Sequence, residues 1–102
     1  MNFLIVAYDG KDEHALERRM RVRPDHFANV LRIKEKGHVH CAGGITNEEG
    51  QLIGSMLVVS FDTREQLDDY LKTEPYVVNN VWQDIRIDTC NVAIKDGELI
   101  SK

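Results

Sequence analysis

The sequence is poor in cysteine and has no long apolar run, and each shortage excludes a class of protein. Its two cysteines, Cys41 and Cys90, form neither a CxxC pair nor a zinc-finger spacing. This usage favours buried free thiols over a disulfide scaffold. The apolar run from Phe3 to Tyr8 is too short to cross a bilayer and lacks the basic leader of a signal peptide. We therefore expect a cytoplasmic protein with no membrane partner.

Basic residues are also in the minority. The 102 residues include 13 lysines and arginines against 17 aspartates and glutamates, which gives a net charge of −4. This balance argues against a nucleic-acid partner. With 42% hydrophobic residues, the chain is expected to form one domain over residues 1–102. Such a domain has a core of its own but is small enough to be stabilised by a partner subunit.

The apolar pattern predicts four strands and two helical regions. The expected strands cover residues 3–8, 38–45, 52–61 and 81–94, with a bulge near 88–89, and the expected helical regions cover 12–37 and 63–74. Pro24 is expected to kink the first helical region or divide it in two. Thr63-x-x-Gln66 fits a capping box at the start of the second, and Pro75 ends it. The tail from Lys95 onward is expected to be loose.

This order of elements predicts a ferredoxin-like α+β fold, in which a four-stranded antiparallel sheet carries both helices on one face. The first strand is apolar on both sides, so we expect it to be buried on both faces. No remaining element covers the open face of the sheet. We therefore expect that face to pack against the same face of a second subunit in a homodimer. In the second strand, Val39 and Cys41 are expected to share a face.

His26 is the first candidate for chemistry, because it follows four arginines in the segment Arg18–His26. Proline is favoured at the first position of a helix, so Arg23 is expected at the N-cap and His26 in the first turn. The positive end of the helix would favour a neutral imidazole that can accept a proton. The alternative is that His26 is a partly buried packing residue and the arginines form a solvated face.

Three more residues are candidates for the same cleft or for purely structural roles. Arg23, and more weakly Arg19, could hold an anionic group through charge-assisted hydrogen bonds. Arg23 could instead form a structural bridge to Glu74 or to a helix end. Ser55 could donate a hydrogen bond into the cleft or face solvent.

Aromatic and histidine pairs offer further candidates. Tyr76 and Trp82 could line a pocket, or could close the core or a dimer seam. His38 and His40 place two imidazoles on one strand face, but no third ligand follows at a telling spacing. We therefore predict no metal site.

Several motifs together resemble the YciI-like (YCII-related) family over about residues 2–94. They are Leu16–His26, Ala42-Gly43-Gly44, Gly54-Ser55 and Glu74-Pro75-Tyr76-Val77. The resemblance implies the dimeric α+β barrel superfamily, in which two ferredoxin-like subunits pack sheet to sheet.

The resemblance also implies a site. The family pairs the histidine with an aspartate in an Asp-Pro-Tyr motif, which implies a catalytic pair of His26 and Glu74. It further places Gly43 in the substrate cleft. Glu74 is one methylene longer than the usual aspartate, and Gly44 replaces the proline of an Ala-Gly-Pro turn. The family includes a dehydrochlorinase that acts on a chlorinated hydroquinone, while most members have no assigned substrate.

From these residues we expect a small cofactor-independent enzyme, a dehydrochlorinase-like lyase or an isomerase. His26, oriented by Glu74, would remove a proton from a small anionic or hydroxylated aromatic ligand. Two alternatives stay open. One is a non-catalytic module that binds a small anionic metabolite in the same cleft. The other is an oxygenase of the wider superfamily, which would consume oxygen or carry haem.

Overall fold

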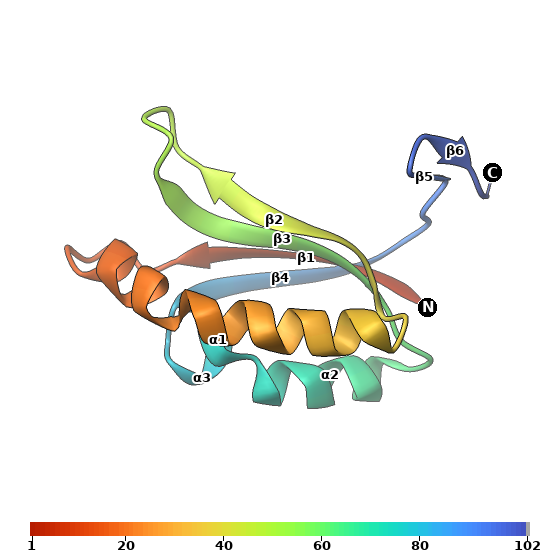
Figure 1. The fold of residues 1–102 in the computed structure, drawn as a ribbon, viewed down its shortest axis with the longest axis horizontal. Helices are drawn as coiled ribbons and strands as arrows, with labels where there is room; N and C mark the ends of the chain where they lie inside the picture. The colour runs from red at the N-terminus through yellow and green to blue at the C-terminus, as the bar shows by residue number, and fades with distance from the viewer. Residues whose placement is uncertain (102) are drawn as a thin grey trace.

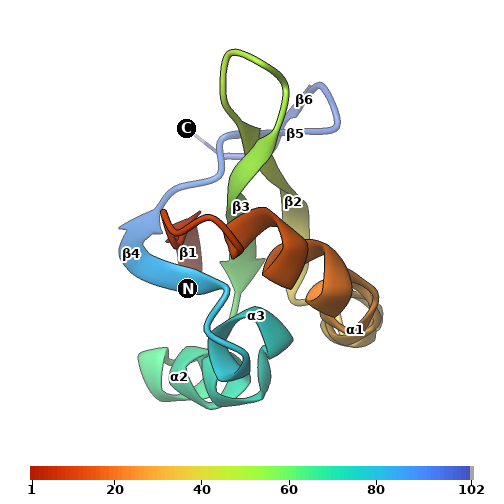
Figure 2. The ribbon, with the colours of Figure 1, turned by 90° about the vertical axis from the view of Figure 1, so that its left-hand side faces the viewer.

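A computed structural model describes residues 1–101 and contains one four-stranded antiparallel sheet with the helices on one face (Figures 1 and 2). Its elements are β1 (Asn2–Asp9), α1 (Ala15–Glu35), β2 (Val39–Thr46), β3 (Leu52–Ser60), α2 (Arg64–Thr73), α3 (Pro75–Val78) and β4 (Trp82–Cys90), followed by β5 (Ile94–Lys95) and β6 (Glu98–Leu99). The strand order in the sheet is β2-β3-β1-β4. The predicted ferredoxin-like fold is confirmed. Among residues 1–101, no helix is long and apolar enough to span a membrane.

β1 alternates between the two faces of the sheet. Phe3, Ile5 and Ala7 are at most 1% exposed and face the helices. On the opposite face, Leu4 is half-buried and Tyr8 is 41% exposed. Within a single chain only one face of this strand is buried, so the expectation that both faces are buried depends on the second subunit. No element among residues 1–101 covers most of the second face.

The predicted hairpin of β2 and β3 is present, but a bulge alters the faces of β2. Val39 pairs with Val59 and Cys41 with Val58, so the irregularity falls at His40. Because one extra residue reverses the alternation, Val39 and Cys41 lie on opposite faces, contrary to our prediction.

The thiols partly match their prediction. Cys41 and Cys90 are both free, as expected. Cys41 is exposed and Cys90 is half-buried, so the expectation that both are buried is wrong.

α1 runs without a break through Pro24. A proline inside a helix removes one hydrogen bond and costs about 3 kcal/mol. Helix packing compensates for this cost, because a buried stripe on α1 contacts the sheet. Its members are Arg19, Val22, His26, Val30 and Ile33. Of the two alternatives for this region, one continuous helix is the correct one.

The start of α2 follows its predicted cap. The Thr63 side chain accepts a hydrogen bond from the backbone of Gln66 at 3.2 Å, and the Gln66 side chain accepts one from the backbone of Asp62 at 3.0 Å. At the other end, Pro75 excludes helical geometry at Glu74, which ends α2 and caps α3. Glu74 is thereby held at the junction of two helices.

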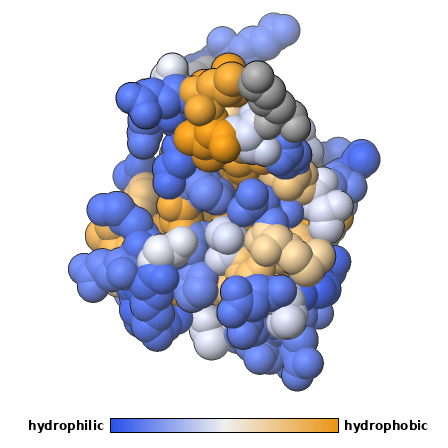
Figure 3. All heavy atoms as spheres, turned by 90° about the vertical axis from the view of Figure 1, so that its right-hand side faces the viewer, coloured by the Kyte–Doolittle hydropathy of each residue, from blue (hydrophilic) through white to orange (hydrophobic). Residues whose placement is uncertain are grey.

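The C-terminal segment differs from its prediction. β4 ends at Cys90 and pairs with β1 without an irregularity at Asp88 or Thr89, since the register shift lies at Tyr8 and Asp9. Beyond it, β5 and β6 form a two-stranded hairpin instead of a loose tail. Ile94 and Leu99 in this hairpin, and Ile100 directly after it, are exposed. Hydrophobic surface gathers at the end of the molecule where this hairpin lies (Figure 3).

Candidate active site

His26 lies in the middle of α1, not in a first turn. The N-cap of this helix is His14, so our placement of Arg23 at the N-cap is wrong, and the positive end of the helix does not act on the imidazole. His26 is 6% exposed within the buried stripe of α1. Its surroundings are therefore set by tertiary packing rather than by a helix terminus.

The carboxylate of Glu74 lies directly beside the imidazole. His26 Nδ1 is 2.5 Å from Glu74 Oε1, and Glu74 is 0% exposed. Two further donors reach the same carboxylate: the Tyr70 hydroxyl donates to Oε2 at 2.5 Å, and the backbone N–H of Tyr76 donates to Oε1 at 3.2 Å. Hydrogen bonds to a carboxylate favour its charged form.

This arrangement assigns roles to the two ring nitrogens. If Nδ1 carries the proton, it donates a hydrogen bond to the Glu74 carboxylate, and Nε2 of a neutral imidazole keeps its lone pair. His26 lines a small cavity between α1 and the β2–β3 hairpin. The imidazole therefore contacts a buried carboxylate and also borders a cavity.

Aromatic rings hold the imidazole in place. The Tyr76 ring stacks on it, and Trp82 lies edge-on with a centroid distance of 5.8 Å. Tyr76 borders the cavity, whereas Trp82 does not and is 3% exposed. Of the two alternatives for Trp82, packing in the core is the one that the structure shows.

Arg19 lines this cavity, is buried, and takes part in a network of hydrogen bonds between polar side chains. Its Nη1 donates to both oxygens of Asp9, at 3.0 and 3.2 Å, and its Nη2 donates to Ser55 Oγ at 2.9 Å. Trp82 Nε1 also donates to Ser55 Oγ, at 3.1 Å. Burial raises the pKa of the Asp9 carboxyl, and the Arg19 guanidinium offsets only part of that rise. Ser55 is 1% exposed and faces neither solvent nor the cavity.

Arg23 borders the cavity without a carboxylate partner. Its guanidinium lies over the Phe27 ring at 4.8 Å, and it forms no ion pair among residues 1–101. The alternative of a structural bridge to Glu74 is therefore not formed. Arg23 is the charged group that a bound anion would meet at the rim.

The cavity measures about 60 Å³ and collects most, but not all, of the predicted site. Predicted residues that line it are Arg19, Arg23, His26, Gly43 and Tyr76. Glu74 and Ser55 lie behind the lining and hold His26 and Arg19, respectively.

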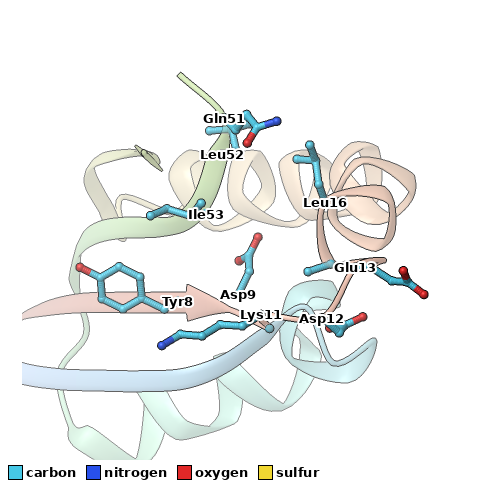
Figure 4. Close-up of a pocket in the computed structure, with 11 residues that line it drawn as sticks. Tyr8, Asp9, Lys11, Asp12, Glu13, Leu16, Gln51, Leu52 and Ile53 are labelled. Carbon is cyan, nitrogen blue, oxygen red and sulfur yellow. The ribbon is translucent and has the colours of Figure 1, made fainter. Parts of the chain in front are cut away.

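A larger hollow of about 450 Å³ opens at the end of β1, where Asp9 lies between Leu16 and Ile53 (Figure 4). Arg19, the partner of Asp9, instead lines the smaller cavity that His26 borders. The Asp9–Arg19 pair therefore separates the two hollows.

His38 and His40, the two histidines predicted to share a strand face, form hydrogen bonds outside the candidate site. His38 Nδ1 is 2.8 Å from the Ser60 carbonyl, and His40 Nε2 is 3.0 Å from Asn2 Oδ1. Within residues 1–101, no group of three histidine, cysteine, aspartate or glutamate side chains is placed to hold a metal ion.

Sequence reasoning missed two polar residues of this network. Asp9 continues the alternation of buried residues in β1, so its position in the strand already placed it on the helix face. Tyr70 stands four residues before Glu74, which is the spacing of neighbours on one helix face. The sequence pattern indicates only the end of a strand at Asp9 and a core position at Tyr70.

The fold and this site define a ferredoxin-like α+β protein with a buried histidine–carboxylate pair. The chain matches the YCII-related domain over residues 1–91 and belongs to that family. The resemblance noted in the sequence is thereby confirmed.

Individual relatives agree with this assignment. Protein YciI of Escherichia coli O6:H1 is 28% identical over 93 residues, which cover 85% of this chain and 93% of that protein. The aspercryptin biosynthesis cluster protein B of Emericella nidulans is 32% identical over 76 residues, covering 68% of this chain and 49% of that protein. The chain thus spans about half the length of this fungal relative.

A solved structure supports the fold. It is the 5-chloro-2-hydroxyhydroquinone dehydrochlorinase of Burkholderia phenoliruptrix AC1100 in complex with 2,5-dihydroxybenzoquinone. The TM-score is 0.77 at 16% identity, over 89% of this chain and 94% of the other. At this identity the similarity concerns the fold alone.

Proposed function

We propose that this protein is a small cofactor-independent enzyme, a lyase or isomerase, in which His26 is the general base and Glu74 orients it. The observation that carries the proposal is the 2.5 Å contact between Nδ1 and a fully buried carboxylate, on an imidazole that borders a cavity. Burying a charge is costly unless it is paired, and such pairs are frequent at functional sites.

The proposed step balances without a redox partner. Nε2 of His26 takes a proton from a ring hydroxyl or from a carbon next to a carbonyl. In a lyase, the electron pair left behind forms a new double bond, and a leaving group departs with its own bonding pair from a tetrahedral carbon. In a hydroxylated ring, tautomerisation first makes that carbon tetrahedral by adding a proton to it, and the imidazolium finally gives its proton to water. In an isomerase no group leaves, and the imidazolium returns the proton to another carbon of the substrate. Glu74 stabilises the imidazolium, and Arg23 stabilises the oxyanion.

The chemistry of the cavity indicates the ligand class. Arg23 supplies positive charge at the rim, and Tyr76 and Phe27 supply aromatic faces. These groups suit a small hydroxylated aromatic ring or its anion. The dehydrochlorinase that shares the fold is named for a chlorinated, hydroxylated ring, which supports the same class.

The cavity must widen to admit such a ring. Ligand pockets usually measure about 300 Å³ or more, whereas this one measures about 60 Å³. Its rim includes Phe27, which is 46% exposed, and the half-buried Arg23. Both are long side chains that can rotate outward without a change in the backbone.

We also infer a homodimer that buries the open face of the sheet. That face carries the half-buried apolar residues Leu4, Met56 and Val58. A charged residue in the middle of it should abolish association. We therefore expect Val58→Asp to be a monomer by light scattering, while Leu31→Asp, at an exposed position on α1, keeps the dimer. A Val58→Asp variant that stays dimeric would place the interface elsewhere.

Two substitutions of His26 separate catalysis from folding. His26→Asn keeps an amide nitrogen near the position of Nδ1, so it can still donate to Glu74, but it removes Nε2. His26→Gln offers an amide near Nε2 and removes Nδ1. His14→Asn is the control, because the His14 side chain is 69% exposed. Thermal unfolding establishes that each variant is folded.

The assay uses 5-chloro-2-hydroxyhydroquinone and follows chloride release, with 2,5-dihydroxybenzoquinone as the calorimetric binding probe. We expect chloride release by the wild type and by His14→Asn, and a loss of roughly 10²-fold or more in His26→Asn. Binding of the probe without turnover would favour the non-catalytic binding module. If the probe does not bind, hydroxylated rings are the wrong ligand class.

A further inference from the structure

Glu74 has more hydrogen-bond donors around its carboxylate than the proposed pairing with His26 requires. Its carboxylate has no exposure to solvent, and donors from three residues reach its two oxygens. Among residues 1–101, Oε1 contacts His26 Nδ1 and accepts from the backbone N–H of Tyr76, while Oε2 accepts only from the Tyr70 hydroxyl. The orientation of the carboxylate therefore depends on Tyr70 at one end and on His26 at the other.

Tyr70 is placed for this contact by the helix that carries both residues. It lies four residues before Glu74 near the end of α2, is 5% exposed, and donates at 2.5 Å. Burial and the adjacent Glu74 both raise the pKa of the Tyr70 phenol. The hydroxyl thus stays protonated, and remains a donor, across the range in which a histidine titrates.

We propose that Tyr70 is a positioning residue of the site, and that its hydroxyl orients Glu74 so that His26 is held as its Nδ1–H tautomer. This inference rests on the proposed function of His26. Without the hydroxyl, Oε2 would be a buried acceptor with no partner, and the carboxylate would lose its second anchor. The extra methylene of glutamate allows the carboxylate to rotate, and Tyr70 restricts that rotation.

The geometry offers a clean way to isolate the hydroxyl. The Tyr70 ring stacks on Phe61 with centroids 5.9 Å apart, and a phenylalanine would keep this packing. Tyr70→Phe therefore removes one donor and little else. Tyr8→Phe is the matched control, since it removes a hydroxyl from a 41% exposed ring on the opposite face of the sheet.

The first readout is the ¹⁵N NMR spectrum of the His26 imidazole, which distinguishes the two neutral tautomers and needs no substrate. We expect the Nδ1–H tautomer in the wild type and in Tyr8→Phe. In Tyr70→Phe we expect a mixture of tautomers or an exchange-broadened signal. When Glu74→Gln is already present, adding Tyr70→Phe should change the spectrum little, because the anchored carboxylate is gone.

The second readout is kinetic. If the proposed chloride release is found, Tyr70→Phe should lower kcat by roughly tenfold with KM nearly unchanged, since general acid–base catalysis contributes about 10²–10⁴-fold in all. An imidazole spectrum identical to that of the wild type would overturn the role of Tyr70, whatever the activity. Turnover that persists in His26→Asn would instead overturn the proposed function, while a tautomer change in Tyr70→Phe would still stand.

Discussion

The imidazole of His26 lies face to face with the phenol ring of Tyr76, with centroids 4.0 Å apart and planes inclined by 12°. Tyr76 is 0% exposed, and its hydroxyl has no hydrogen-bond partner among residues 1–101. The ring thus serves packing, while its hydroxyl is a buried polar group that a ligand in the cavity could satisfy. A group kept at a cost to stability is typical of a binding site.

Tyr76→Phe should therefore stabilise the protein and weaken ligand binding. Removing an unpaired buried hydroxyl should leave the free energy of unfolding equal or raise it by up to about 1 kcal/mol. Tyr76→Leu loses the stack as well and should cost about 2–4 kcal/mol. Urea unfolding measures stability, and calorimetry with 2,5-dihydroxybenzoquinone measures binding. Lower stability in Tyr76→Phe would mean that the hydroxyl is already satisfied in the free protein.

Arg19→Met should be among the most destabilising single changes in the chain. It leaves the carboxylate of Asp9 buried without its partner, which costs about 3–5 kcal/mol. Adding Asp9→Leu removes the stranded charge, so the double variant should recover much of this loss. Urea unfolding of the wild type, Arg19→Met, Asp9→Leu and the double variant gives the coupling between the two positions.

The neighbouring pair is a matched control for this prediction. Arg18 bonds to Asp12, whose side chain is 48% exposed. Because solvent screens such a pair, Arg18→Met should cost at most about 1 kcal/mol. Equal losses in Arg18→Met and Arg19→Met would show that burial of the Asp9–Arg19 pair is energetically unimportant.

Stability should fall at alkaline pH. Burial raises the pKa of both Tyr70 and Tyr76 above the ordinary value of 10.0. Below that value both phenols are protonated in the folded and the unfolded chain, so neither makes the free energy of unfolding depend on pH. Above it the unfolded chain releases protons that the folded chain retains, so unfolding becomes more favourable. The slope is at most about 1.4 kcal/mol per pH unit for each phenol.

Tyr70→Phe tests the sign and source of this slope. The variant has one such phenol fewer, so its free energy of unfolding should decrease less steeply above about pH 10. Urea unfolding at several alkaline pH values measures the two slopes. Parallel slopes would show that Tyr70 keeps no extra proton in the folded state.

Gly54→Ala should be much more destabilising than Gly43→Ala. A Cβ at residue 54 would lie 2.4 Å from the backbone carbonyl oxygen of Ala7, so β1 or β3 must move. A Cβ at residue 43 would meet only the Met56 sulfur, at 3.8 Å. We expect a loss of about 1–3 kcal/mol for Gly54→Ala, and a much smaller change for Gly43→Ala. Similar Tm values for the two variants would contradict the close approach of β1 and β3.

Local signals in the sequence were reliable where they acted within a few residues. The capping box at Thr63 and the stop at Pro75 place Glu74 at the end of α2, and the turn before Leu52 creates the β2–β3 hairpin. The paired motifs of His26 and Glu74 also indicated which residues meet. The cap, the stop and the turn have short-range causes, such as a fixed φ angle or an alternating pattern, whereas the pair was indicated by the resemblance to the family.

Local signals failed where distant residues decide the outcome. Pro24 suggested a helix start, but α1 continues through it because burial of the stripe around His26 outweighs the local cost. The bulge at His40, which moves Cys41 to the other face, has no clear local signal.

The sequence by itself determined the order of elements and the fold, because periodicity and turn chemistry are local properties. Its motifs indicated the pair His26 and Glu74 through the resemblance to the family. Only the tertiary structure decided that Tyr70 donates a hydrogen bond to Glu74 and that Asp9 pairs with Arg19. It also decided that His26 borders a cavity lined from α1, β2, β3 and α3. These contacts join residues on different faces and elements, and their energies depend on burial, which no local pattern encodes.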